Sequence, residues 1–238
     1  MTRLQQFSCL TLLLTLNLAK IVAQSTDTTA LVVQDKKAYL ATIASSPIKR
    51  MVNVNKLIPS LKMELRYASK NNFTGKRMYP PSSTTCYLRE EAASALKAVS
   101  DSLSKRGFDL KIFDAYRPYA VTARFWKLIR DERYVANPRL GSGHNRGIAI
   151  DLTLVDKSTG VEIDMGTGFD NFSTAAHHSY LELQPQVLLN RKILKEIMEH
   201  FGFKSLETEW WHYSLPNPKR YEVLNLSFRE LSDLPVSD

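Results

Sequence analysis

The chain has 238 residues, of which 44% are hydrophobic and 24% are charged, and its formal net charge is +8. This composition excludes an intrinsically disordered chain and a protein with many membrane spans. The basic residues are scattered rather than clustered, so the charge indicates a general attraction to anionic surfaces such as a cell wall and argues against nucleic-acid binding.

The first 23 residues have the layout of a secretory signal peptide. A basic start at Arg3 is followed by an apolar run over residues 7–19 and by a small residue at Ala23. The run is too short for a membrane span, and Lys20 interrupts it; the alternative is an uncleaved N-terminal anchor. We therefore expect an exported protein, periplasmic or secreted, with residues 1–23 as the signal peptide and no stable membrane span after cleavage.

Cleavage there would change both the cysteine content and the charge of the chain. Of the two cysteines, Cys9 would leave with the signal peptide, so Cys86 could form no intramolecular disulfide. We expect Cys86 to be a small buried residue. The signal peptide contains two basic residues and no acid, which leaves a charge of about +6 on the mature chain.

The remaining chain is expected to be one folded domain of residues 51–238, preceded by a loosely held lead-in of residues 24–50. Alternating apolar residues predict strands, and apolar stripes at helical spacing predict helices. The expected strands are 63–67, 108–116, 148–155 and 208–215, and the expected helices are 89–107, 117–133 and 187–203. Because the two kinds of element are interspersed, we predict an α+β domain with a mainly antiparallel sheet flanked by helices.

Two of the five histidines have a carboxylate close by in the sequence and lie where a strand meets a loop. Asp151 follows His144 by seven positions, and Glu209 precedes His212 by three. Two histidines and one carboxylate form a common open zinc site, and a further carboxylate that is not a ligand can act as the general base. The other histidines are interpreted as surface or structural residues: His177, His178 and His200.

The backbone must bend for these pairs to converge. Residues three apart in a regular strand face opposite sides, so Glu209 and His212 need a bend near Glu209. His144 and Asp151 converge only if the chain folds back between them, where Gly147 removes bulk. An unpaired carboxylate in the apolar strand around Asp151 would be costly, so a cation is expected there. Spacing alone leaves open a turn histidine followed by an ordinary strand.

The motifs around these residues occur together with three others. Residues 142–151, SGHNRGIAID, fit Ser-x-His-x-x-Gly-x-Ala-x-Asp, and EWWH fits Glu-x-x-His. Further motifs are RYASKNNFTGK at 66–76, DAYRP at 114–118 and MGTGFD at 165–170. Together the motifs span about residues 55–215. They resemble the zinc D,D-peptidases that act on peptidoglycan precursors and wall peptides, and most of all the D-alanyl-D-alanine dipeptidases of the VanX type.

The resemblance implies hydrolysis of the dipeptide D-Ala-D-Ala to D-alanine, with a role for each matching residue. The ligands that it implies for one Zn²⁺ per chain, at the edge where the sheet meets its loops, are His144, Asp151 and His212. Glu209 would be the general base for the zinc-bound water, and Arg117 would stabilise the tetrahedral oxyanion. The substrate contacts that it implies are Ser142, Tyr67 and Asp170, the last through the substrate ammonium group.

Two other functions share these motifs or the fold. A D,D-carboxypeptidase that trims longer wall peptides would use the same zinc ligands but need an open groove, and the EWWHY and FTGK matches favour the dipeptidase. A non-catalytic wall-peptide-binding relative would not need Glu209 and Arg117. Arg117 on its own could instead be the ion-pair partner of Asp114. The expected partner is a small dipeptide substrate and not nucleic acid; the sequence indicates no oligomeric state. An exported enzyme would act in salvage or turnover of wall-derived dipeptide.

Overall fold

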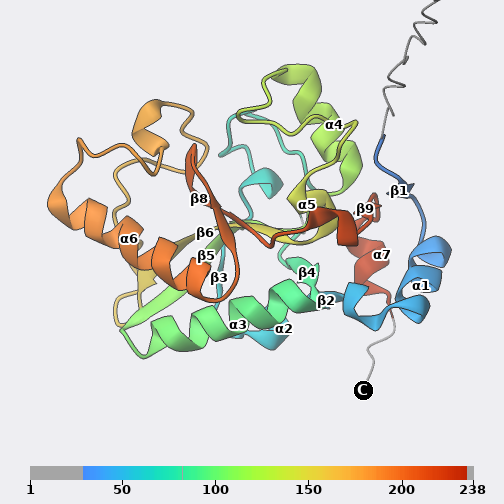
Figure 1. Ribbon diagram of the computed structural model, residues 1–238, viewed down its shortest axis with the longest axis horizontal. Coiled ribbons are helices and arrows are strands. Elements are labelled where there is room, and N and C mark those ends of the chain that lie inside the picture. The colour runs from blue at the N-terminus through green and yellow to red at the C-terminus, as the bar shows by residue number, and fades with distance from the viewer. Residues whose placement is uncertain (1–28, 82, 235–238) are drawn as a thin grey trace, which may run out of the picture.

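A five-stranded mixed sheet forms the centre of the structure, which is a computed structural model that describes residues 29–81 and 83–234 (Figure 1). The strands in these ranges are β1 (Val32–Val33), β2 (Met51–Asn53), β3 (Lys62–Met63), β4 (Tyr87–Arg89), β5 (Phe108–Asp114), β6 (Ala149–Asp156), β7 (Lys204–Leu206), β8 (Glu209–Ser214) and β9 (Val223–Leu224). The central sheet has the order β3-β5-β6-β8-β7, and only β3 and β5 run parallel. The predicted α+β fold with a mainly antiparallel sheet is confirmed.

Helices lie on both sides of this sheet, with α3 below it and α4 above it in the view of Figure 1. The helices are α1 (Lys36–Ser45), α2 (Val54–Leu57), α3 (Glu90–Ser104), α4 (Tyr119–Leu128), α5 (Gly143–Arg146), α6 (Pro185–His200) and α7 (Phe228–Ser232). Short 3₁₀ turns are η1 (Pro47–Lys49), η2 (Arg66–Ala68), η3 (Thr174–Ala176) and η4 (Pro218–Arg220). Across the described ranges, no helix combines the length and the apolar character needed to cross a membrane.

The apolar stripe of α3 is buried as its spacing predicts. Ala92, Leu96, Val99 and Leu103 have no exposed surface and join the main core beneath the sheet. Each fully buried leucine or valine side chain contributes about 1.5–3 kcal/mol through removal of apolar area from water. Burial of this stripe therefore fixes α3 against β5, the strand that leads to the DAYRP motif. Cys86 is buried as expected, and burial raises the pKa of its thiol to about 12.

Two predicted elements extend four or more residues beyond the observed ends. The strand predicted at 63–67 ends at Met63, because the chain then turns into η2. This turn places the Tyr67 ring against Phe125 of α4, with the ring centres 4.8 Å apart. The helix predicted at 117–133 begins at Tyr119 and ends at Leu128, where Ile129 takes an extended conformation. Local hydrogen bonds between Arg133 and Asp131 hold the chain that follows in a turn.

The segment before Arg50 is not loosely held in its described part, so that expectation is wrong for residues 29–50. Tyr39 of α1 has no exposed surface, and its hydroxyl accepts a hydrogen bond from the Met51 N–H at 2.6 Å. In addition, β1 pairs with β9. This segment therefore packs against the C-terminal part of the domain. The predicted signal peptide, residues 1–23, lies outside the described residues.

Candidate metal centre

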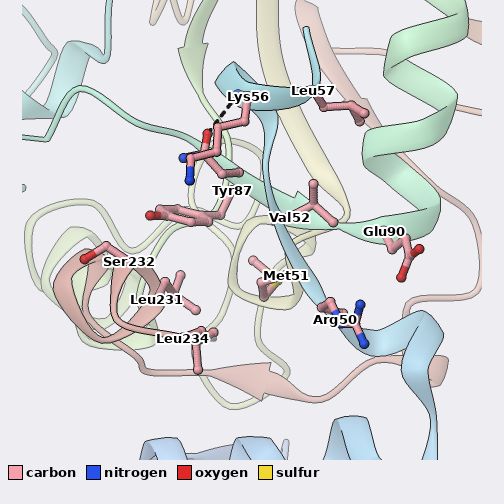
Figure 2. A pocket seen from close by; sticks show the side chains of 11 residues that line it. Arg50, Met51, Val52, Lys56, Leu57, Tyr87, Glu90, Leu231, Ser232 and Leu234 are labelled. Carbon is pink, nitrogen blue, oxygen red and sulfur yellow. Dashed lines mark hydrogen bonds between the residues drawn. The ribbon is translucent and has the colours of Figure 1, made fainter. Parts of the chain in front are cut away.

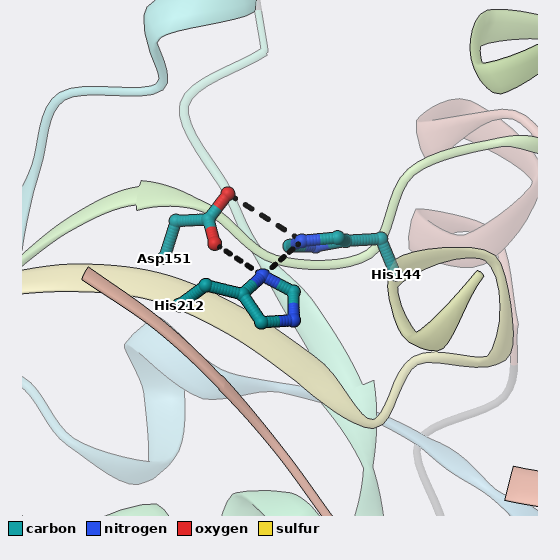
Figure 3. Close-up of side chains that lie close together, drawn as sticks. All are labelled: His144, Asp151 and His212. Atoms are coloured by element: carbon teal, nitrogen blue, oxygen red, sulfur yellow. Dashed lines mark hydrogen bonds and ion pairs between the residues drawn. The ribbon is translucent and has the colours of Figure 1, made fainter. Parts of the chain in front are cut away.

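Three side chains converge where helix α5 meets the internal strands β6 and β8 of the sheet, as Figure 3 shows. His144 comes from α5, Asp151 from β6 and His212 from β8. His144 Nε2 lies 3.2 Å from His212 Nδ1 and 3.4 Å from one Asp151 oxygen, and the other Asp151 oxygen lies 2.9 Å from His212 Nδ1. The three residues that the sequence predicts as ligands are thus brought together.

Two local features of the backbone produce this convergence. Asp151 and His212 are direct partners in the antiparallel pairing of β6 with β8, which places their side chains side by side. His144 returns to them because α5 ends at Arg146 and is capped by Gly147, whose φ of 71° lies in the left-handed region. A Cβ at Gly147 would also lie 2.7 Å from the Met51 sulfur, so the predicted need for a glycine at this bend is explained.

The separations fit a small divalent cation. Zinc with nitrogen and oxygen ligands at about 2.0–2.2 Å in a tetrahedron places its ligand atoms roughly 3.3 Å apart. His144 Nδ1 donates to the Ala115 carbonyl at 2.7 Å, which leaves Nε2 directed at the cluster with its lone pair. Burial would raise the pKa of Asp151, but His144 and His212 outweigh it and hold the carboxylate ionised. The donor set therefore fits zinc.

Glu209 lies beside the cluster, at the start of β8. The pairing of β7 with β8 has a register shift. Ser205 pairs with Tyr213, but the next residue of β7, Leu206, pairs with Glu209, so residues 210–212 of β8 bulge out of the pairing. This bulge is the bend that the sequence analysis required, and it brings the Glu209 carboxylate to 3.9 Å from His212 Nδ1. Burial, opposed by His212 and assisted by Asp151, raises the pKa of Glu209 to about 8.

Arg117 is fixed by a buried carboxylate. Its Nε and Nη2 donate to one Asp114 oxygen at 3.0 and 2.7 Å, while the Tyr79 hydroxyl donates to the other at 2.7 Å. The guanidinium carbon lies 5.2 Å from the centre of the Tyr67 ring and 4.9 Å from that of Phe125. Burial opposes the charge of Arg117, but Asp114 outweighs it and holds the guanidinium pKa well above its ordinary value.

The predicted substrate contacts occupy two separate places. The Tyr67 hydroxyl donates to Asp170 at 3.0 Å, and burial together with the Asp151 charge raises the pKa of Asp170 to about 7. Ser142 lies at the other side as the N-cap of α5, where its hydroxyl oxygen accepts from the Asn145 N–H at 3.0 Å. As an acceptor in this cap, Ser142 keeps its own hydroxyl proton available for another partner.

A cavity of about 290 Å³ opens directly onto the cluster. Its lining includes His144, His212, Glu209, Arg117 and Ser142, together with Glu132, Arg133, Tyr134, Ala136 and Leu206. Tyr67 and Asp170 are not part of this lining. Glu209 and Arg117 thus both face the space beside the three ligand side chains, where a small substrate would lie.

A second pocket of about 350 Å³ lies apart from this cavity, between β2, α2 and α7 (Figure 2). Its lining is mostly apolar, with charged groups at Arg50, Lys56 and Glu90. The lining contains none of the histidines of the cluster, and its volume alone does not make it a reactive site. The smaller cavity, in contrast, is lined by both histidines of the cluster together with Glu209 and Arg117.

Several groups that build the site gave no signal in the sequence. Ala115 acts through its backbone carbonyl, which no side-chain pattern reveals. Tyr79 lies in a proline-rich loop with no periodicity, yet its hydroxyl fixes Asp114. Asp114 was expected only as an alternative partner that would argue against a role for Arg117. In the structure the ion pair orients the arginine, so the two interpretations are compatible.

Comparison with known proteins gives consistent matches over most of the chain. A family model described as D-ala-D-ala dipeptidase, peptidase M15, matches residues 48–230. A D-alanyl-D-alanine dipeptidase of Escherichia coli (strain K12) is 37% identical over 179 residues, which is 75% of this chain and 91% of the relative. One of Streptomyces coelicolor is 31% identical over 71% of this chain and 94% of the relative.

A solved structure described as VanYB in complex with D-Alanine-D-Alanine is 16% identical, with a TM-score of 0.38 over 58% of this chain and 76% of that one. The segment matched by the family model, residues 48–230, contains every residue of the site described above.

Proposed function

The chain belongs to the D-ala-D-ala dipeptidase family, peptidase M15, and on this premise we propose that it is a zinc peptidase that hydrolyses D-Ala-D-Ala to D-alanine. The observation that carries the proposal is the convergence of His144, Asp151 and His212 beside Glu209. A structural ion-pair cluster would not require a free carboxylate with a raised pKa and a cavity at the same point.

The metal ligands in this proposal are the two histidines and the aspartate of the cluster. When bound there, zinc would polarise the peptide carbonyl and lower the pKa of a water molecule. The Ala115 carbonyl keeps His144 in the tautomer that offers Nε2. Asp151 supplies the negative charge that a dication needs, and it is already held ionised by its neighbours.

Glu209 is proposed as the general base. Glu209 is 8% exposed, and its carboxylate lies 3.9 Å from His212 Nδ1, beside the proposed ligands rather than among them. Burial raises its pKa to about 8, which makes an ionised Glu209 a stronger proton acceptor than an exposed glutamate. The Glu209 carboxylate accepts a proton from the water molecule that attacks the peptide carbonyl carbon, and it delivers that proton to the leaving amine as the C–N bond breaks.

Arg117 is proposed as the donor to the oxygen on which negative charge develops. Asp114 occupies Nε and Nη2, so the guanidinium is held in one orientation before substrate arrives. Because an arginine stays protonated and reaches the cavity here, it can stabilise an oxyanion without reorganisation.

The substrate contacts follow from charge and position. Asp170 and the Tyr67 hydroxyl form a polar pair 3.0 Å apart that suits an ammonium group, and the hydroxyl proton of Ser142, which lines the cavity, suits an acceptor oxygen. A zwitterionic dipeptide carries both groups, so the cavity and these two places together favour a small substrate.

The experiment is a hydrolysis assay on purified protein with two substrates. The proposal predicts release of D-alanine from free D-Ala-D-Ala, its loss after treatment with a chelator and its return on addition of Zn²⁺. A pentapeptide stem that ends in D-Ala-D-Ala serves as the second substrate. Faster hydrolysis of the pentapeptide would establish a D,D-carboxypeptidase instead, and zinc binding without hydrolysis of either would establish a wall-peptide-binding protein.

Export is part of the same proposal. Residues 1–23 are proposed as a signal peptide because of their basic start and apolar run, and residues 51–238 as the catalytic domain. An exported dipeptidase would act on wall-derived dipeptide, in salvage or turnover. Fractionation of cells that express the full chain tests this: mature protein that begins after residue 23, outside the inner membrane, is expected. Cytosolic protein with residues 1–23 intact would refute it.

A further inference from the structure

The segment from Asp164 to His178 carries Asp170 to its contact with Tyr67, yet its regular structure is limited to the single turn η3. A segment without a ladder of backbone hydrogen bonds takes its shape from contacts with its neighbours. The position of the Asp170 carboxylate therefore depends on whatever holds this segment.

The backbone at Asp170 is in a conformation that needs such support. Its φ of 60° lies in the left-handed region, which side chains other than glycine seldom adopt. Its carboxylate accepts hydrogen bonds from the Tyr67 hydroxyl at 3.0 Å and from the Phe73 N–H at 3.4 Å. A strained conformation of this kind persists only where the surrounding structure over-determines it. A segment free to relax would turn the carboxylate away from Tyr67.

Arg191 of α6 fastens the segment on both sides of Asp170. Its side chain is 5% exposed, and its guanidinium donates to three backbone carbonyls. Nε binds the Met165 carbonyl at 2.8 Å, Nη2 that of Ala175 at 2.9 Å and Nη1 that of His177 at 3.1 Å. These carbonyls stand five positions before Asp170 and five and seven positions after it. The Arg191 side chain thus links the backbone before Asp170, at Met165, to the backbone after it, at Ala175 and His177.

Two neighbours reinforce this attachment. Asn190 donates to the Asp164 carbonyl at 2.8 Å, and the Trp210 indole N–H donates to the Thr167 hydroxyl at 2.8 Å. Arg191 forms no ion pair with any residue that the structure describes, and its buried charge is balanced by the three carbonyls and by the Trp210 ring, whose centre lies 5.9 Å from the guanidinium carbon. A guanidinium supplies several donors in a rigid fork, whereas a lysine ammonium is a single point that cannot reach all three carbonyls.

We propose that Arg191 is a positioning residue for substrate binding: it holds the 164–178 segment so that Asp170 presents its carboxylate to the substrate ammonium group. This inference rests on the proposed function, because it gives Asp170 the ammonium contact. Arg191 itself touches neither the metal ligands nor the cavity; it acts through Asp170.

The test is a double-mutant cycle on the zinc-loaded enzyme with D-Ala-D-Ala as substrate. The variants are Arg191→Lys, Asp170→Asn and the double variant. Arg191→Lys should raise KM by about tenfold and leave kcat within about twofold, because a positioning defect weakens binding of the ammonium. In the Asp170→Asn background the same substitution should change KM by less than about twofold, since its target is already gone.

Two further variants keep the test decisive. Asn190→Ala removes one reinforcing bond and should raise KM by about threefold, again only while Asp170 is present. Lys192→Met removes a cation from the exposed face of α6 and should leave KM unchanged. The inference is overturned if Arg191→Lys or Asn190→Ala leaves KM unchanged, or if either raises KM by the same factor in both backgrounds. Lack of D-Ala-D-Ala hydrolysis by the wild type would instead refute the proposed function.

Discussion

Replacing Asp114 with asparagine removes the charge that balances Arg117 while it keeps the size of the side chain. Asp114 has no exposed surface, and its carboxylate accepts hydrogen bonds from Tyr79 and, twice, from Arg117. The substitution would leave a buried guanidinium whose other carboxylate contact in the described chain, Asp151, is 4.0 Å away. Both stability and catalysis should therefore fall.

The size of each effect follows from these contacts. Removing one partner of a buried ion pair costs about 3–5 kcal/mol, and the remaining amide carbonyl places Asp114→Asn near the lower end, about 3 kcal/mol. In a domain of this length that lowers Tm by roughly 6–12 °C. Deleting a preorganised oxyanion donor typically lowers kcat by about 10²–10³. Arg117 would be displaced rather than deleted, so we expect kcat to fall by about 10–100-fold with little change in KM.

Thermal unfolding and steady-state hydrolysis of D-Ala-D-Ala measure the two effects on the same preparation, with zinc content determined in parallel. Asp101→Asn is the matched control, because Asp101 pairs with Lys97 on the surface of α3. The Asp101 side chain is 58% exposed and the Lys97 side chain 44%. Exposed pairs of this kind contribute about 0.5 kcal/mol or less. A folded, zinc-loaded Asp114→Asn protein that matched the control in Tm and kcat would refute the positioning of Arg117 by Asp114.

Three further predictions concern the same site. Glu209→Gln should still bind zinc, but its kcat should fall by more than about 10²-fold. His212→Ala should lose both zinc binding and activity, as metal analysis and kinetics would show. Full activity in either variant would contradict the mechanism. Burial raises the pKa of Asp170 to about 7, so the unfolded chain ionises this group at lower pH than the folded chain does, and stability is lost as pH rises from about 4 to 7. In metal-free protein, Asp170→Asn should then have a higher Tm than wild type at pH 8 but not at pH 4, and an equal difference at both pH values would exclude this linkage. Gly147→Ala places a side chain at a position with left-handed backbone and against the Met51 sulfur. It should lower the free energy of unfolding by about 1–3 kcal/mol and weaken zinc binding. An unchanged urea denaturation curve and an unchanged zinc affinity would refute the role of Gly147 in bringing His144 to the cluster.

The candidate ligand set could be anticipated because its members lie in motifs that resemble those of a known family, whereas their spacing alone left a turn histidine and an ordinary strand as an alternative. His144 and Asp151 are a polar pair in an apolar context, and Gly147 between them marks the reversal that makes them converge. The bend at Glu209 could be inferred only as a requirement, since EWWHY reads as a regular strand. Its physical cause, the bulge opposite Leu206, depends on a neighbouring strand and not on local sequence.

The parts that could not be predicted rest on backbone groups or on long-range contacts. The Ala115 carbonyl orients His144 from 29 residues away, and the Tyr79 hydroxyl reaches Asp114 across 35 residues. Alternation around Tyr67 suggested a longer strand, because a buried side chain in a 3₁₀ turn gives the same pattern as one in a strand. Helix α5 spans only four residues, too few for any helical periodicity.

If Asp151 and His212 bind a cation as proposed, their direct pairing would couple cation binding to the register of the sheet. If β6 and β8 slipped past each other by one residue, every side chain of the shifted strand would change face, and the two ligands would separate. A cation that needs both ligands, together with His144, binds only the correctly aligned sheet and adds its binding free energy to that alignment alone. Zinc present during refolding would thus act as a template that draws misaligned chains toward the native pairing.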